Sequence, residues 1–278
     1  MKIPFSVSTC IFADLSPEAC VDAMAAAGFA YGELGFEHGL MLLERQGDAF
    51  RLGSDFCSYA ADRGVCFPQG HLDLNLDMCR DTDRFKVWLD LFHGIGIKAA
   101  VIHANGATDL CYEAQLETRA KALRELVSHV EGTGITICVE NLFANPMVRT
   151  ADTLLELLDA AGQTGLGVCL DIGHLHRTAS HGLTDQTSRE FIEKCGSKLK
   201  ALHVHDNMGV NDDHLFPFCK NGLDWKMFMT ALLESGYDGL FNMELPGESH
   251  GSLAVRQLRM AYAHELVEYL FSETFLNP

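Results

Sequence analysis

The chain has 278 residues, of which 47% are hydrophobic, and this length is typical of a single (β/α)₈ barrel. Its 21 basic and 38 acidic side chains give a formal net charge of −17, which repels polyanions and argues against nucleic acid as a partner. Because no uncharged apolar stretch is long enough to cross a bilayer, we do not expect a membrane protein.

Eight short β-rich segments alternate with longer segments that have helical spacing. The predicted strands are residues 3–9, 30–35, 65–70, 97–103, 135–140, 166–171, 199–205 and 239–244. Eight alternations with no element left over predict an α/β fold, a closed parallel (β/α)₈ TIM barrel; a doubly wound sheet is the main alternative. No Pro-rich linker or charge block divides the chain, so we expect one domain over residues 1–278.

Local signals agree with this alternation. The first strand is expected near the start of the chain, where Pro4 interrupts an apolar run that is too irregular for a signal peptide. Ser16 and Pro17 are typical of a helix start. Four glycines stand where a helix should end before the next strand: Gly28, Gly64, Gly96 and Gly134.

The segment after the fourth strand shows the helical pattern well. Its apolar residues fall three or four positions apart and predict one buried face: Leu116, Ala120, Leu123, Val127 and Val130. The intervening positions are charged, and we expect them, including Arg119, to face solvent.

The ten cysteines are scattered singly, without a Cys-x-x-Cys pair. In a chain that is large enough to be stable without cross-links, this pattern indicates reduced thiols and a cytoplasmic location. Cys138 and Cys169 lie inside predicted strands, so we expect small core residues there and not metal ligands.

Metal-binding residue types stand at the ends of six predicted strands. They are His71, His103, Glu140, Asp171, His203 and Glu244, with His174 one turn beyond the sixth strand. The carboxyl ends of barrel strands converge on one mouth, where catalytic groups lie. A single polar residue at a strand end is usually only solvated or hydrogen-bonded, but six of them together predict a metal centre. Carboxylates and imidazoles without thiolate favour one divalent ion, Mn²⁺ first, with Zn²⁺, Co²⁺ or Mg²⁺ as alternatives.

These residues lie in motifs that resemble the xylose isomerase-like barrels, which include sugar isomerases and epimerases, inosose dehydratases and four-type apurinic endonucleases. The matching strings, in order, are CVEN (138–141), LDIGH (170–174), LHVHDN (202–207), DDH (212–214), DW (224–225) and MELPG (243–247). The resemblance implies four shared metal ligands: Glu140, Asp171, His203 and Glu244. It also implies further ligand positions of the kind that three-metal endonucleases fill: His71, His103, His174, Asp212 and His214.

From this site we expect proton transfer next to a carbonyl of a sugar or polyol, through an enediolate, giving isomerisation or epimerisation. Glu140 and Glu244 are the predicted acid/base pair, and His174 is a third catalytic residue. Asp206 or a neighbouring carbonyl is expected to orient an imidazole. The predicted substrate-binding residues are Glu33, His71, His103, His205, His214 and Lys220. Only Lys220 offers positive charge near the last two loops, so an unphosphorylated substrate is favoured.

Three alternatives stay open. An inosose dehydratase or C-glycoside lyase would use nearly the same ligands. A zinc-dependent apurinic endonuclease would use all nine candidate ligands, although the acidic charge and the absence of basic loops oppose DNA binding. A barrel that has lost catalysis would serve as a binding subunit, but it would have no physical reason to keep both glutamates. A homo-oligomer is compatible with each of these functions.

Overall fold

The computed structural model describes residues 3–245 and 251–276. Its strands are β1 (Phe5–Ser8), β2 (Tyr31–Leu34), β3 (Cys66–His71), β4 (Ala99–Ile102), β5 (Thr136–Glu140), β6 (Leu166–Asp171), β7 (Leu199–His203) and β8 (Phe241–Met243). Its α-helices are α1 (Pro17–Ala26), α2 (Phe36–Leu43), α3 (Ala49–Ala61), α4 (Thr82–Ile95), α5 (Tyr112–His129), α6 (Ala151–Ala161), α7 (Ile172–Ser180), α8 (Ser188–Cys195), α9 (Trp225–Ser235), α10 (Leu253–Leu270) and α11 (Glu273–Leu276). Short 3₁₀ helices are η1 (Thr9–Phe12), η2 (Pro146–Val148) and η3 (Gly196–Lys198).

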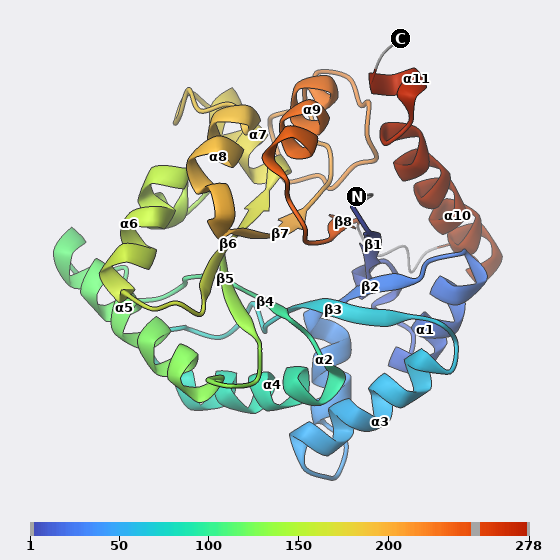
Figure 1. Cartoon of the computed structure of the whole chain (residues 1–278), viewed down its shortest axis with the longest axis horizontal. Helices are drawn as coiled ribbons and strands as arrows, with labels where there is room; N and C mark the ends of the chain where they lie inside the picture. Colours follow the sequence, from blue (N-terminus) through green and yellow to red (C-terminus); the bar gives the residue numbers. More distant parts are fainter. Residues whose placement is uncertain (1–2, 246–250, 277–278) are drawn as a thin grey trace.

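The strands form one parallel sheet in the order β7-β6-β5-β4-β3-β2-β1-β8. Its two edge strands meet through a parallel bridge between Val204 and Met243. There the Val204 N–H donates to the Asn242 carbonyl at 2.8 Å, and the Glu244 N–H donates to the Val204 carbonyl at 3.0 Å. The sheet is therefore a nearly closed (β/α)₈ barrel surrounded by helices, as the alternation predicted, and not a doubly wound sheet (Figure 1).

Local signals for helix ends are confirmed. The Ser16 side chain accepts the Ala19 N–H, and Pro17 occupies the first turn of α1. The four predicted helix-ending glycines all have positive φ, between 74° and 89°. Only glycine adopts this conformation without a steric penalty. Gly96 is the C-cap of α4 and Gly28 follows the cap of α1, whereas Gly64 and Gly134 lie in the turns beyond the caps of α3 and α5.

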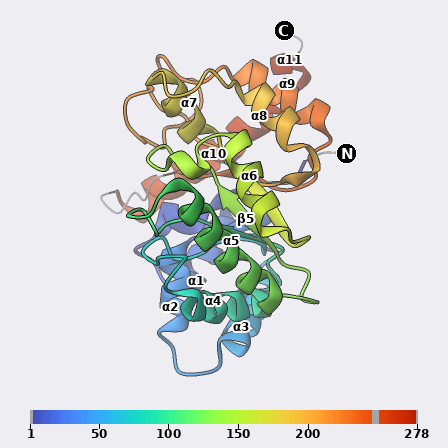
Figure 2. The same ribbon diagram turned by 90° about the vertical axis from the view of Figure 1, so that its left-hand side faces the viewer.

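Helix α5 corrects one expectation. Its apolar face packs inward as predicted, and it lies beside α6 over β5 (Figure 2). Arg119, however, is fully buried and does not face solvent. Its Nε donates to the Ala104 carbonyl at 2.9 Å, and its Nη2 donates to the Gly106 carbonyl. The buried guanidinium therefore holds the loop between β4 and α5 in place through hydrogen bonds to its backbone.

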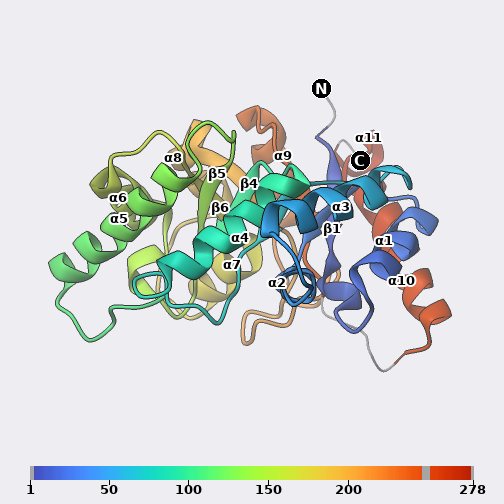
Figure 3. The ribbon, with the colours of Figure 1, turned by 90° about the horizontal axis from the view of Figure 1, so that it is seen from below.

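Two strands are followed by an additional helix at the barrel mouth. Helix α2 begins two residues after β2, and α7 begins directly after β6. Figure 3 shows both helices at the same end of the barrel, the end toward which β1 runs. They therefore flank the mouth, while α3 and α8 return the chain along the outside.

Small side chains fill the barrel beneath the mouth. Val101, Cys138, Cys169 and Ala201 form a buried cluster contributed by four neighbouring strands. Burial raises the pKa of the Cys138 thiol to about 12, so the thiol stays neutral. All ten cysteines are free. Within the ranges given above, no helix combines the length and apolarity that a membrane crossing requires.

His38 in α2 is a buried histidine, and the carboxylates of Asp14 and Glu18 only partly offset the effect of its burial. Its Nε2–H donates to the Leu15 carbonyl at 3.2 Å, its Nδ1 has no partner, and burial lowers its pKa to about 4. The unfolded chain, with a value near 6.5, takes up the proton first as the pH falls. The neutral His38 ring therefore contributes its full share to the free energy of unfolding above pH 6.5. This share, about 3 kcal/mol, is lost as the pH falls from 6.5 to 4.

Urea unfolding of the wild type and His38→Gln between pH 7 and 4 measures this loss. The glutamine amide can still donate to Leu15 but does not titrate. We expect the wild type to lose stability relative to the variant as the pH falls. Parallel pH profiles for the two proteins would show that His38 does not carry the effect.

Candidate metal centre at the barrel mouth

The strand ends converge as predicted, and Glu140 lies at their centre. This carboxylate, at the end of β5, is only 1% exposed. His71 Nε2 and His103 Nε2 each lie 3.1 Å from Glu140 Oε2, and His174 Nδ1 lies 3.3 Å from Oε1. Strands β3, β4 and β5 are neighbours in the sheet, so their register brings these groups together. One carboxylate thus faces three imidazoles.

His203, at the end of β7, is held with one ring nitrogen free. Its Nε2–H donates to Glu33 Oε2 at 2.8 Å, and the Gln69 side chain donates to the same oxygen at 2.6 Å. In the neutral ring that metal binding requires, this pairing leaves the lone pair on His203 Nδ1, and that atom is buried without a hydrogen-bond partner. Glu140 Oε2 lies 3.4 Å and Glu244 Oε2 lies 3.3 Å from it. A buried lone pair between carboxylates fits a metal cation.

Asp171 links the end of β6 to the start of α7. Its Oδ1 caps the helix by accepting the His174 N–H at 2.6 Å, as expected for Asp at an N-cap. Its Oδ2 lies 3.1 Å from His205 Nε2. A Cβ at Gly173 would lie 2.0 Å from the His205 ring, so only glycine lets this ring pack against the helix. The Asp-Ile-Gly-His motif is therefore explained by its local packing.

Asp212 and His214 lie on the loop between β7 and α9. Asp212 Oδ2 lies 2.9 Å from His174 Nε2 and 3.5 Å from His214 Nε2. The His214 ring stacks on His205 with centroids 3.8 Å apart. His214 has a φ of 47°, an uncommon conformation for a side-chain-bearing residue that often marks a functional constraint.

Of the two groups expected to orient an imidazole, it is a carbonyl and not the Asp206 side chain that does so: His205 Nδ1 lies 3.3 Å from the backbone carbonyl of Asp206. The Asp206 carboxylate orients no imidazole; it accepts N–H groups from Asn207, Cys219 and Leu223 and from the Trp225 indole. These distances run from 2.8 to 3.2 Å, and the carboxylate is fully buried. Asp206 therefore closes the loop that carries Asp212 and His214.

The candidate ligands fall into overlapping groups, each with its ligand atoms within 4.8 Å of one another. The groups are His71–His103–Glu140; Asp171–His203–Glu244; Glu140–Asp171–His174; His205–Asp212–His214; and Glu140–Cys169–His203. Burial raises the pKa of the Cys169 thiol well above its ordinary value, so this thiol is a neutral group beneath the site. A buried cluster of His, Asp and Glu that could bind a metal is thus present.

Opposite charges stabilise one another in this cluster. Burial alone would raise the pKa of Glu140, but His203 and His103 hold it well below its ordinary value. Burial alone would lower the pKa of His174, but Asp171 and Asp212 raise it well above its ordinary value. The carboxylates are therefore anionic at neutral pH, as metal ligation requires.

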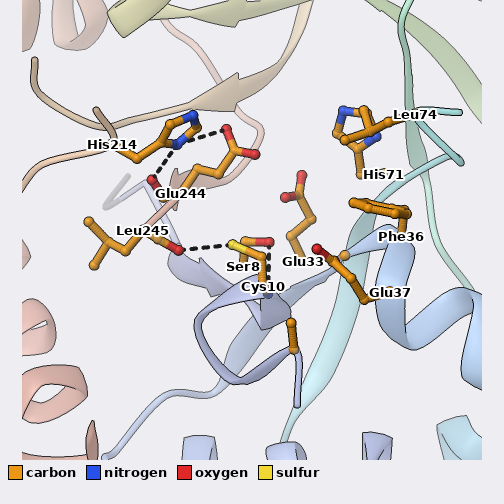
Figure 4. Close-up of a pocket in the computed structure, with 12 residues that line it drawn as sticks. Ser8, Cys10, Glu33, Phe36, Glu37, His71, Leu74, His214, Glu244 and Leu245 are labelled. Atoms are coloured by element: carbon orange, nitrogen blue, oxygen red, sulfur yellow. Dashed lines mark hydrogen bonds and ion pairs between the residues drawn. The ribbon is translucent and has the colours of Figure 1, made fainter. Parts of the chain in front are cut away.

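A cavity of about 310 Å³ opens beside these ligands (Figure 4). It is lined by Ser8, Cys10, Ala13, Glu33, Gly35, Phe36, Glu37, His71, Leu74, His214, Glu244 and Leu245. Of the predicted substrate-binding residues, Glu33, His71 and His214 line it, whereas His103 and His205 lie among the ligand groups. Lys220 is exposed in a turn and is not part of this lining.

Sequence reasoning missed three polar residues of this cavity. Ser8 is the last residue of β1, so its position at a strand end was a readable signal. Cys10 lies in η1 and donates through Sγ to the Leu245 carbonyl at 3.0 Å. Glu37 lies in the first turn of α2, a helix that the strand periodicity did not separate from α3.

Comparison with known proteins places this geometry in a family. A family profile for xylose isomerase-like TIM barrels matches residues 21–268. The chain belongs to this family. The sequence is also similar to an uncharacterised protein of Sinorhizobium fredii (26% identical over 170 residues, 59% of this chain and 52% of the relative). It is similar to a probable endonuclease 4 of Mycobacterium bovis (28% over 115 residues, 41% and 43%). The chain thus spans about half the length of these relatives.

Solved structures resemble this xylose isomerase-like barrel over nearly its whole length. A D-tagatose 3-epimerase-like protein has a TM-score of 0.74 and 21% identity, and the match covers 96% of this chain and 98% of that one. A D-psicose 3-epimerase determined in the presence of D-fructose has a TM-score of 0.76 and 13% identity, with 99% and 100% covered. The 3-keto-D-glucoside 4-epimerase of E. coli has a TM-score of 0.74 and 12% identity, with 95% and 100% covered. At these identities the likeness shows the shared fold.

Proposed function

We propose that this protein is a divalent-metal-dependent isomerase or epimerase that acts on an unphosphorylated ketose or polyol. The observation that carries the proposal is the buried, unpartnered Nδ1 of His203 between the carboxylates of Glu140 and Glu244. Of the three similar structures named above, two are sugar epimerases and one is a D-tagatose 3-epimerase-like protein, which supports a sugar as substrate.

The ligands proposed for the ion are Glu140, Asp171, His203 and Glu244. Glu33 holds the His203 ring in the tautomer that presents Nδ1 to the site. Carboxylates and imidazoles fit Mn²⁺ first, and Zn²⁺, Co²⁺ and Mg²⁺ are compatible alternatives. When bound, the metal supplies Lewis-acid stabilisation of negative charge that develops on substrate oxygen.

Two glutamates provide the proposed proton transfer. Glu140 and Glu244 come from β5 and from the end of β8, which are not neighbours in the sheet. A sugar bound between them would meet one carboxylate on each side. One carboxylate would remove the proton next to the carbonyl, leaving an enediolate, and the other would return a proton on the opposite face. His174 Nδ1 bonds to the Asn141 carbonyl and Nε2 bonds to Asp212, so His174 would donate to a substrate oxygen by exchanging its bond to Asp212.

A second candidate is a zinc-dependent phosphodiesterase like the apurinic endonucleases. The observation that favours it is the presence of two ligand groups besides the one around His203, His71–His103–Glu140 and His205–Asp212–His214. The net charge of −17 opposes DNA as its substrate. A dehydratase or C-glycoside lyase would use the first-proposed ligands with a different leaving group.

The test measures proton exchange directly. Protein loaded with Mn²⁺ is incubated with D-fructose, D-tagatose or D-psicose in D₂O, and NMR follows loss of the proton at carbon 3 and formation of the epimer. We expect exchange that requires the metal. No exchange with any ketose, together with two or three zinc ions per chain and hydrolysis of bis(p-nitrophenyl) phosphate, would replace this proposal by the phosphodiesterase.

A further inference from the structure

Two carboxylates, those of Glu33 and Glu37, line one side of the 310 Å³ cavity, and we call this side the carboxylate wall. We infer that this wall, formed by Glu33 and Glu37, binds an ammonium group, so that the substrate is an amino-substituted sugar or polyol. The inference rests on the proposed function, because it assumes that the reacting end of this substrate binds on the opposite side of the cavity, next to the proposed metal. Figure 4 shows the Glu33 carboxylate pointing into the space between Glu244 and His71, with Glu37 beside it.

Two buried oxygens of the wall have no hydrogen-bond donor. Glu33 is 1% exposed; its Oε2 accepts from His203 and Gln69, but its Oε1 has no partner. Glu37 Oε2 is also buried without a partner. Leaving a buried charged acceptor unpaired costs several kcal/mol, so such atoms normally meet a donor from a ligand, a water or an ion.

The surrounding groups offer almost no donors to these oxygens. Both ring nitrogens of His71 are engaged, by the Leu72 carbonyl and by Glu140. His214 faces the Glu244 carbonyl and Asp212, and Cys10 Sγ donates to a carbonyl. The Gly35 N–H donates to Thr9 Oγ1 at 2.8 Å. Ser8 Oγ accepts the Cys10 N–H, and its hydroxyl is the one further donor among these lining groups, so two free oxygens face fewer donors than they can accept and a ligand that carries several donors fits here.

Charge decides between a hydroxyl and an ammonium. Among the described residues that line the cavity, none is Lys or Arg. Burial raises the pKa of Glu37, and the nearby carboxylates of Glu244 and Glu33 raise it further. An ammonium supplies three N–H donors and a positive charge, so it satisfies both free oxygens and offsets their repulsion. A phosphate at this position would meet two carboxylates and is excluded.

Three ligands that differ at one carbon test the inference: 6-amino-6-deoxy-D-fructose, D-fructose and D-fructose 6-phosphate. Titration calorimetry with the Mn²⁺-loaded protein is expected to give at least about tenfold tighter binding of the amino sugar than of D-fructose, and weakest binding of the phosphate. In Glu37→Gln, which keeps the shape of the side chain, the preference for the amino sugar should fall severalfold. Glu193→Gln removes the same charge from exposed α8 and should keep the preference.

Equal affinities, preference for the phosphate, or no measurable binding of any of the three would overturn the inference. So would an unchanged preference in Glu37→Gln. Exchange at carbon 3 of D-fructose, measured in D₂O, reports on the proposed function separately. Exchange without an amino preference refutes only the inference about the wall, whereas an amino preference without exchange refutes only the proposed reaction.

Discussion

Replacing Glu140 by glutamine is expected to lower turnover by about 10²- to 10⁴-fold, the usual contribution of a positioned acid or base. Glutamine has nearly the same shape, but it cannot accept a proton at neutral pH. It also removes the negative charge that faces His71, His103 and His203. Because Glu140 is itself a proposed ligand and an amide binds a divalent cation more weakly than a carboxylate, we expect the variant to bind less metal as well.

The assay is proton exchange on a ketose in D₂O, together with elemental analysis of metal per chain. Glu113→Gln, an exposed residue in the first turn of α5, is the matched control and should keep both activity and metal. Circular dichroism checks that each variant is folded. A folded Glu140→Gln protein with wild-type turnover would exclude Glu140 as the acid or base of the proposed proton transfer.

Replacing Arg119 by alanine should destabilise the fold by about 3 kcal/mol. The guanidinium is fully buried and donates to the Ala104 and Gly106 carbonyls, and its Nη1 donates to Gln115 Oε1 at 3.1 Å. Alanine would leave a cavity and unsatisfied carbonyls in the loop that follows β4. The free energy of unfolding from urea titration measures the loss.

Arg189→Ala provides the comparison for that experiment. Arg189 pairs with Glu193 and Glu234 on the exposed surface, so its loss should cost less than about 1 kcal/mol. Similar losses for the two variants would mean that the buried hydrogen bonds of Arg119 are weak. A large loss confined to Arg119→Ala would show that the loop depends on them.

The barrel was predictable because its signals are local and repeated. Each predicted strand overlaps an observed one, and the predicted bounds of β6 match the observed bounds at both ends. The match is good because a buried parallel strand is an unbroken apolar run that ends at a polar residue. The same regularity brought Glu140 and His203 to one mouth. A closed barrel converts positions at the ends of separate strands into neighbours, so topology alone was sufficient for that part of the site.

Other features depend on contacts that no local pattern encodes. Arg119 has the spacing of an exposed residue, and its burial follows only from two carbonyls in a neighbouring loop. Asp206 looked like a partner for a histidine because it follows His205, yet its acceptors meet donors up to 19 residues away. Glu37 belongs to a helix that interrupts the β/α alternation, so periodicity gave no reason to place it near the site.

The loop closed by Asp206 also has a consequence for the order in which the molecule assembles. Its carboxylate gathers donors from Asn207 to Trp225, and the backbone of Asp206 pairs with Leu215 in both directions at 2.8 and 2.7 Å. These bonds can form only after the ends of β7 and α9 have docked, because closing a long loop costs entropy that its final contacts must offset. We therefore expect Asp212 and His214 to reach the mouth only after β7 and α9 are in place. A folding intermediate in which this loop has not closed would carry the residues around His203, but Asp212 and His214 would not yet be in place.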